Sequence, residues 1–374
     1  MFWIDFEIEI ANWLVGYPSW VVYIAINFVH VFVDGNLSVN VFWILSAYVI
    51  TIKLFDHKGH LEEDTLLYFA FKRYFRLFIP CLGSILFAYL LLRFHLLYFE
   101  PLASKLGKGY TDGWLNHFYH FKPNLGSAIR SAFWDTFFEF NLKTSYNNPL
   151  WSIYYEFYGS LFVFGLYGIL QKTEKRYIMY ILCLLIAYFV KLSWPICFLM
   201  GMVLSDFTFS EKNRYQKIYA EKLFVFLNKH AFLFISLLVL SLIFGRSILY
   251  RMGAFPEIIN AILGFIVIFG VLHLRGLQNF FERSLFRWLG KISFSLYLLH
   301  VPFFFSFTSW FYLQMPTLSH AKAAVLSCSV TIVILFFISY LYSISVNRFS
   351  IIFSNQIGQY VRNSKKNKQS MDTF

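Results

Sequence analysis

Long apolar runs separated by short polar stretches dominate the chain. Ten runs are visible, at approximately 13–33, 37–55, 78–98, 150–170, 177–192, 194–206, 231–245, 257–274, 292–313 and 322–345. A helix that crosses the hydrocarbon core of a bilayer needs about 20 mainly apolar residues. The pattern therefore predicts an all-α, polytopic membrane protein with about ten transmembrane helices. The run 194–206 is too short to cross upright, so we expect it to be extended, broken or tilted.

Composition and charge agree with this class of protein. Of the 374 residues, 58% are hydrophobic and 14% are charged, whereas soluble domains carry about 25% charged residues. The net charge of +12 could indicate nucleic acid, but cytoplasmic loops of membrane proteins are also rich in Lys and Arg. Alternate loops hold most of the basic residues, which predicts that both termini are cytoplasmic. Membrane lipid is therefore an expected partner and nucleic acid is not. The basic loops are 53–77, 171–176, 207–230, 275–291 and the C-terminal stretch.

The pattern divides the chain into a transmembrane domain, 1–358, and a polar cytoplasmic tail, 359–374, which we expect to lack fixed structure. One long loop, 99–149, lies on the non-cytoplasmic side, and its stretch 127–140 favours an amphipathic helix at the interface. His117 and His120 have helical spacing, but no carboxylate completes a metal site around them, so no metal is expected. No Lys or Arg precedes Lys53, and no cleavable signal peptide is expected.

Glu156 stands out because it lies near the start of the apolar run 150–170. A charge within the bilayer costs about 2.5–3.5 kcal/mol and persists where the group is paired, faces water or takes part in chemistry. Pro149 suits the first turn of a helix, and Trp151 belongs to an interfacial aromatic belt. Glu156 is therefore either an acid in the headgroup layer or a functional carboxylate.

Three further polar positions could carry chemistry. His30, near the outer end of the first run, suits a general base, and Asp34 follows one helical turn later, where it could orient the imidazole. His300 lies inside the run 292–313. Each histidine could instead be a satisfied interfacial or packed side chain.

Arg73 and Arg76 share one helix face in FKRYFRLFIP, at the cytoplasmic mouth of the third run. Two guanidinium groups so placed make a clamp for phosphate. The alternative is an ordinary basic flank of a membrane helix.

Taken in order, these segments resemble the acyltransferase-3 family of integral membrane acyltransferases. The likeness rests on LSVNVFWILSAYVI (37–50), RYFR (73–76) with Pro80, PLWSIYYEF (149–157), FLMGMVLSD (198–206) and ISFSLYLLHVP (292–302). There are departures. Asn40 stands where the family often has an acid, Ala47 replaces a glycine, and Ser19 stands where the family has a basic residue eleven positions before His30. The acid–Pro pair near the end of the last span is absent from SISVNRF (343–349).

The resemblance implies transfer of an acyl group, most often acetyl from acetyl-CoA, to a hydroxyl of an extracytoplasmic or lipid-linked glycan. It implies a multi-pass protein of the inner (plasma) membrane. Transfer could be direct or could pass through an acyl-enzyme. The implied roles are catalysis by His30 and Glu156, acyl-CoA binding by Arg73 and Arg76, and substrate binding by Asp34, Trp151, Ser152 and His300.

Two other interpretations stay open. A proton-coupled transporter or exporter would also place His30, Glu156 and His300 in the membrane, although the chain shows no inverted repeat. A catalytically inactive family member that takes part in glycan assembly is the second, prompted by Ser19.

Overall fold

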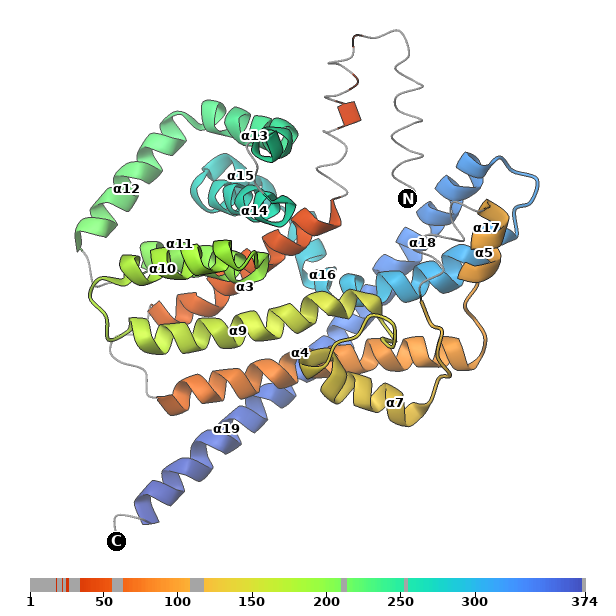
Figure 1. Ribbon diagram of the computed structural model, residues 1–374, viewed down its shortest axis with the longest axis horizontal. Coiled ribbons are helices and arrows are strands. Elements are labelled where there is room, and N and C mark those ends of the chain that lie inside the picture. Colours follow the sequence, from red (N-terminus) through yellow and green to blue (C-terminus); the bar gives the residue numbers. More distant parts are fainter. Residues whose placement is uncertain are drawn as a thin grey trace. The chain divides into compact units, whose positions relative to one another are not determined.

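The computed structural model describes residues 18, 22, 25, 26, 34–55, 63–107, 118–209, 214–251 and 255–371. In these ranges the regular structure is entirely helical (Figure 1). The chain divides into two compact units. Unit 1 holds residues 68–157 and 284–374, and unit 2 holds residues 2–67 and 158–283.

Unit 1 contains the long helices α4, α16, α18 and α19 and several short elements of the loop between α4 and α9. Three of its elements, η2, η4 and η5, are single turns of π-helix, and η3 is a 3₁₀ turn. The bounds are α4 Glu63–Arg93, α5 Phe99–Leu106, α7 Leu125–Arg130, η2 Ser131–Asp135, α8 Thr136–Phe138, η3 Asn148–Leu150, α9 Trp151–Leu170, α16 Ser284–Phe303, η4 Phe304–Thr308, α17 Ser309–Leu313, α18 His320–Tyr342, η5 Ser343–Asn347 and α19 Arg348–Met371. Helices α4 and α9 each continue across a unit boundary.

Unit 2 is built on the packing of α11 against α3 (Figure 1). The two backbones approach closely at Gly201, where a Cβ atom would lie 2.2 Å from the carbonyl oxygen of Ile44. Only glycine fits at this crossing. Helix α14 packs on α3 and α13, and α10 packs on α11. The bounds are α3 Gly35–Phe55, α10 Arg176–Phe189, α11 Ser193–Phe209, α12 Arg214–Lys229, α13 Ala231–Arg251, α14 Pro256–His273 and α15 Arg275–Phe281.

Five described helices are long and apolar enough to cross a membrane, or seven when two sharply bent pairs each count as one span. When two shorter apolar helices, α10 and α11, are included, the described helices correspond to nine of the ten expected runs. The first run, 13–33, falls almost wholly outside the described residues. In the described residues the structure confirms a helical fold with helices long and apolar enough to span a membrane, while the count of ten and the side of the termini stay predictions.

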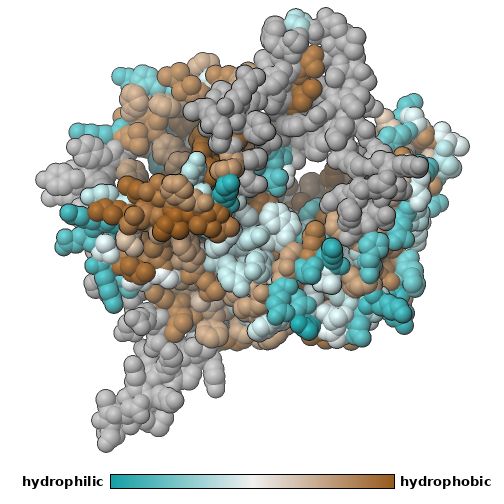
Figure 2. Space-filling model, in the orientation of Figure 1, coloured by the Kyte–Doolittle hydropathy of each residue, from teal (hydrophilic) through white to brown (hydrophobic). Residues whose placement is uncertain are grey.

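On the face that Figure 2 shows, apolar residues form part of the surface, and polar residues form another part. Large aliphatic and aromatic residues such as Phe189, Phe232 and Val333 are more than two thirds exposed. Exposed apolar surface on this scale marks contact with something other than water. Together with the helix lengths, it fits helices that face lipid.

Two expectations about helix limits need correction. Helix α4 begins at Glu63, well before the expected start near residue 78. Arg73 and Arg76 therefore lie inside the helix, within the candidate span 65–93. Helix α19 runs to Met371, so most of the tail 359–374 is helical. The expected helix at 127–140 corresponds to the continuous helical stretch α7–η2–α8 at 125–138.

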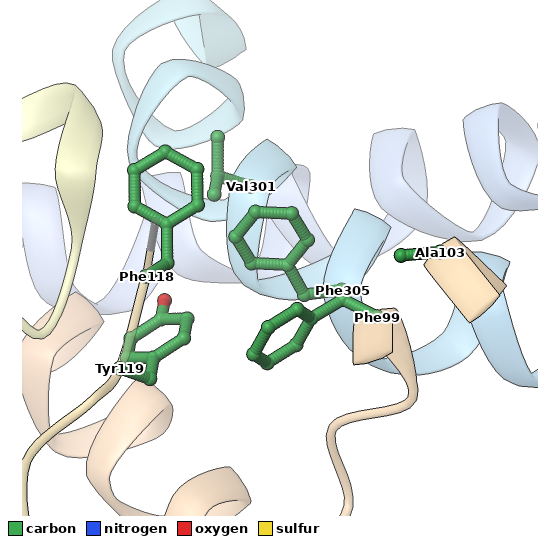
Figure 3. Close-up of a cluster of buried hydrophobic side chains, with 6 residues drawn as sticks. All are labelled: Phe99, Ala103, Phe118, Tyr119, Val301 and Phe305. Atoms are coloured by element: carbon green, nitrogen blue, oxygen red, sulfur yellow. The ribbon is translucent and has the colours of Figure 1, made fainter. Parts of the chain in front are cut away.

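A buried aromatic cluster anchors part of the loop that leads from α4 to α9. Phe118 and Tyr119 lie against Phe305 of η4 and Phe99 of α5, with the rings turned toward one another (Figure 3). The Tyr119 hydroxyl donates a hydrogen bond to the Tyr146 carbonyl at 3.1 Å. Burial raises the pKa of the Tyr119 phenol, so the group stays protonated as a donor. This hydrogen bond ties the cluster to the segment 145–150.

Candidate functional site

The centre of the candidate site, in unit 1, is an ion pair between Arg73 of α4 and Glu156 of α9. The two residues are 83 positions apart in the sequence. Glu156 is fully buried, and the side chain of Arg73 is 15% exposed. Removing one partner of such a pair leaves a buried charge without compensation. The family resemblance implies acyl-CoA binding by Arg73 and catalysis by Glu156, whereas the structure joins the two side chains in one contact.

A buried turn precedes Glu156. All six residues from 145 to 150 are buried, and the chain is not α-helical until Trp151. The Asn147 side-chain amide donates to the Leu298 carbonyl at 2.8 Å and to the Ser84 hydroxyl at 3.2 Å. These two hydrogen bonds connect the turn to α16 and α4. Irregular backbone inside a membrane protein is stable only where protein buries it or where it lines a polar cavity.

Tyr297 of α16 forms hydrogen bonds at the C-terminal end of the same turn. Its hydroxyl donates to the Pro149 carbonyl at 2.7 Å and lies 2.7 Å from the Ser152 hydroxyl. The Ser152 hydroxyl also lies within hydrogen-bond distance of the Pro149 carbonyl, at 3.2 Å. The start of α9 is therefore held by hydroxyl groups, and Ser152 already has structural partners.

His300 lies one helical turn after Tyr297. Its Nδ1 atom is 2.7 Å from the Tyr297 carbonyl. Because a carbonyl can only accept, this bond assigns the proton to Nδ1 and leaves Nε2 of the neutral ring as an acceptor. The imidazole is partly buried, and this hydrogen bond holds its orientation.

The remaining candidates have different surroundings. Arg76 is exposed and forms no ion pair with any carboxylate in the described ranges. Trp151 is partly buried, and its ring meets Tyr155 edge to face. Asp34 lies in unit 2, where its carboxylate caps α3 by accepting a hydrogen bond from Leu37 N at 3.0 Å. His30 lies outside the described residues.

The structure thus brings Arg73, Glu156, Ser152 and His300 into one unit through contacts of α4, α9 and α16. Sequence reasoning did not select Asn147, Asn148 or Ser84. The signal available for the first two was a polar Asn-Asn pair next to a proline, immediately before an apolar run. It was interpreted only as the start of a helix.

A model of the acyltransferase domain of the acyltransferase-3 family matches residues 8–346. The match covers nine tenths of the chain and includes each candidate residue, so the chain belongs to this family. No curated protein and no solved structure matches the chain. The family and the apolar helices together define a multi-pass membrane protein of the acyltransferase class.

Proposed function

We propose that the protein transfers an acyl group, most often acetyl, from acyl-CoA to a hydroxyl of an extracytoplasmic or lipid-linked glycan in the inner membrane. The main observation behind the proposal is a contact between two residues, largely buried, that belong to two different motifs of the family. Arg73 from RYFR and Glu156 from LWSIYYE form an ion pair inside a helical membrane protein.

In this proposal the acyl donor approaches the arginine side of the pair. Arg76 is exposed and has no carboxylate partner in the described ranges, so its guanidinium is available for a phosphate of the donor. Arg73 lies one turn away and is balanced by Glu156. The two arginines therefore differ in task, with Arg76 binding the donor directly and Arg73 forming the inner wall of the donor site.

His30 is the proposed base, as the family resemblance implies. It takes the proton of the acceptor hydroxyl as the oxygen attacks the thioester carbon. The new C–O ester bond forms, the C–S bond breaks, and the thiolate of CoA leaves and takes up a proton. Glu156 holds Arg73 in place, while Trp151, Ser152, His300 and Asp34 are proposed to contact or orient substrate.

The test uses purified full-length protein with acetyl-CoA and with glycan isolated from cells that lack the protein, because that glycan should not yet carry the acyl group. Thiol release and the mass of the glycan are measured together. We expect thiol release that requires glycan, together with addition of acetyl to the glycan. Correct placement of a base is worth about 10²–10⁴ in rate, so His30→Ala should lose nearly all turnover while its yield and melting temperature stay normal. Full activity of His30→Ala would overturn the assignment of the base. Lack of transfer by the unaltered protein would overturn the proposed function.

A further inference from the structure

Asn148 is the most unusual polar residue in the buried turn. It is 5% exposed, and neither Oδ1 nor Nδ2 has a hydrogen-bond partner in the described part of the chain. Leaving a buried amide without partners costs free energy, because the group loses its hydrogen bonds to water. The contacts within the described part of the protein do not explain why an amide is buried at this position.

The position of Asn148 is fixed by its two neighbours. Asn147 before it is bonded to Ser84 and Leu298, and the carbonyl of Pro149 after it accepts from Tyr297. The turn therefore cannot easily swing the Asn148 amide toward another partner. Asn147 serves as the structural member of the pair, whereas the side chain of Asn148 adds nothing to the hydrogen bonds that hold the turn.

The chemistry of the available group limits what it would bind. A carboxamide offers one acceptor oxygen and one donor NH₂ side by side. Its complement is a neutral pair of one donor and one acceptor. The N–H and C=O of a trans secondary amide point in opposite directions, so such an amide meets one atom of the Asn148 side chain, and a neighbouring amide or hydroxyl of the same substrate meets the other. A phosphate or carboxylate would satisfy Nδ2 and leave Oδ1 unmatched.

We propose that Asn148 is a substrate-binding residue that pairs with a secondary amide of one substrate. The proposal rests on the proposed function, since an acyl-CoA donor carries secondary amides in its pantetheine arm and many glycan acceptors carry N-acetyl groups. In either case Asn148 forms hydrogen bonds with a neutral part of the substrate and does not act as the catalytic base.

The first test compares Asn148→Leu with Asn147→Leu in the purified full chain, by melting temperature without substrate. Leucine has the same number of side-chain heavy atoms as asparagine, with the same branching, and no amide to satisfy. Asn148→Leu should melt at the same temperature or about 2–4 °C higher, because no bond is lost and a buried unpaired amide is removed. Asn147→Leu should melt lower, since it loses two hydrogen bonds. A clearly lower melting temperature for Asn148→Leu would mean that its amide is bonded within the protein and would overturn the proposal.

The second test measures how far ligands raise the melting temperature. Acetyl-CoA is compared with adenosine 3′,5′-bisphosphate, which lacks the pantetheine arm. Methyl N-acetylglucosaminide is compared with methyl glucoside, which lacks the amide. If the amide comes from the donor, Asn148→Leu weakens acetyl-CoA binding about three- to tenfold and leaves the bisphosphate unaffected. If it comes from the acceptor, only the N-acetyl sugar binds more weakly.

Unchanged binding of both amide ligands to Asn148→Leu would overturn the inference, even with an active enzyme. Failure of the proposed function gives a different result: the unaltered protein would show no acyl transfer, and acetyl-CoA would not raise its melting temperature. If the unaltered protein also fails to respond to the N-acetyl sugar, both proposals fall together.

Discussion

Each unit of the molecule contains a largely buried pair of an arginine and an acid, and the surroundings of the two pairs differ. In unit 2, Arg176 donates to Asp206 Oδ1 at 2.6 Å and to the Leu170 carbonyl at 3.1 Å. The Tyr180 hydroxyl donates to Asp206 Oδ2 at 2.9 Å. Both carboxylate oxygens are thus bonded within the protein, and the network closes the turn between α9 and α10.

The pair in unit 1, Arg73 with Glu156, lies beside a different kind of structure. It follows a buried turn whose Asn148 amide has no partner in the described ranges, and an exposed Arg76 lies one turn from Arg73. A buried ion pair is therefore not by itself evidence of a functional site. The pair in unit 1 differs from the pair in unit 2 because polar groups without protein partners in the described ranges, the Asn148 amide and Arg76, lie near it.

The largest expected effect is for Arg73→Met, which leaves Glu156 buried without its partner. We expect the free energy of unfolding to fall by about 3–5 kcal/mol and acyl transfer to be lost. The double variant Arg73→Met/Glu156→Leu should recover much of the stability and none of the activity. Thermal melting and glycan acetylation measure the two properties. Activity in the stable double variant would show that the pair is only structural.

A matched change in unit 2 should separate stability from activity. Asp206→Asn keeps the shape of the side chain and removes its charge, so we expect a loss of about 1–3 kcal/mol in unfolding free energy. Turnover for each folded molecule should equal that of the unaltered protein. A loss of kcat as large as that of the Arg73 variants would contradict the division between the two pairs.

Tyr297→Phe removes the hydroxyl that holds the Pro149 carbonyl and contacts Ser152. One lost hydrogen bond is worth about 1 kcal/mol, and we expect stability to fall by this amount. Because the turn that carries Asn148 is loosened, kcat should fall as well, by less than for the Arg73 variants. Unchanged kcat at the reduced stability would show that the turn does not position the reaction.

The smallest change in stability is expected for Arg76→Gln, since the side chain is exposed and has no carboxylate partner in the described ranges. The unfolding free energy should stay within about 0.5 kcal/mol of the original. The KM for acetyl-CoA should rise about tenfold as a charged contact with phosphate is lost. Arg76→Lys, which keeps the charge, is the control and should show a smaller rise. Equal KM values for all three proteins would remove Arg76 from the donor site.

Much of the fold could be predicted from the apolar runs, because helix length and apolar length are linked in a membrane. The run 194–206 corresponds to α11, Ser193–Phe209, and 37–55 to α3, Gly35–Phe55. The start of α4 could not be predicted in the same way. Its first turns carry charges that are typical of a loop, and the burial of Arg73 depends on a partner that lies 83 positions further along the chain.

Some of the candidate residues could be selected from the sequence, and others could not. Arg73, Glu156 and His300 could be selected because charge and imidazole are rare inside apolar runs. Their partners could not be selected, because a single sequence holds no direct record of which helices touch. Asn148 has no charge, and its importance depends on the absence of bonds, which only coordinates can show.

The most direct test of the central claim is mass spectrometry of surface and lipid-linked glycans from cells that produce the protein and from cells that lack it. Cells without the protein are complemented with the unaltered chain, with His30→Ala, or with Arg73→Met/Glu156→Leu. In cells without the protein, we expect one glycan to be lighter by the mass of one acyl group, most often acetyl. Only the unaltered chain should restore it. Identical glycan profiles with and without the protein would contradict the account.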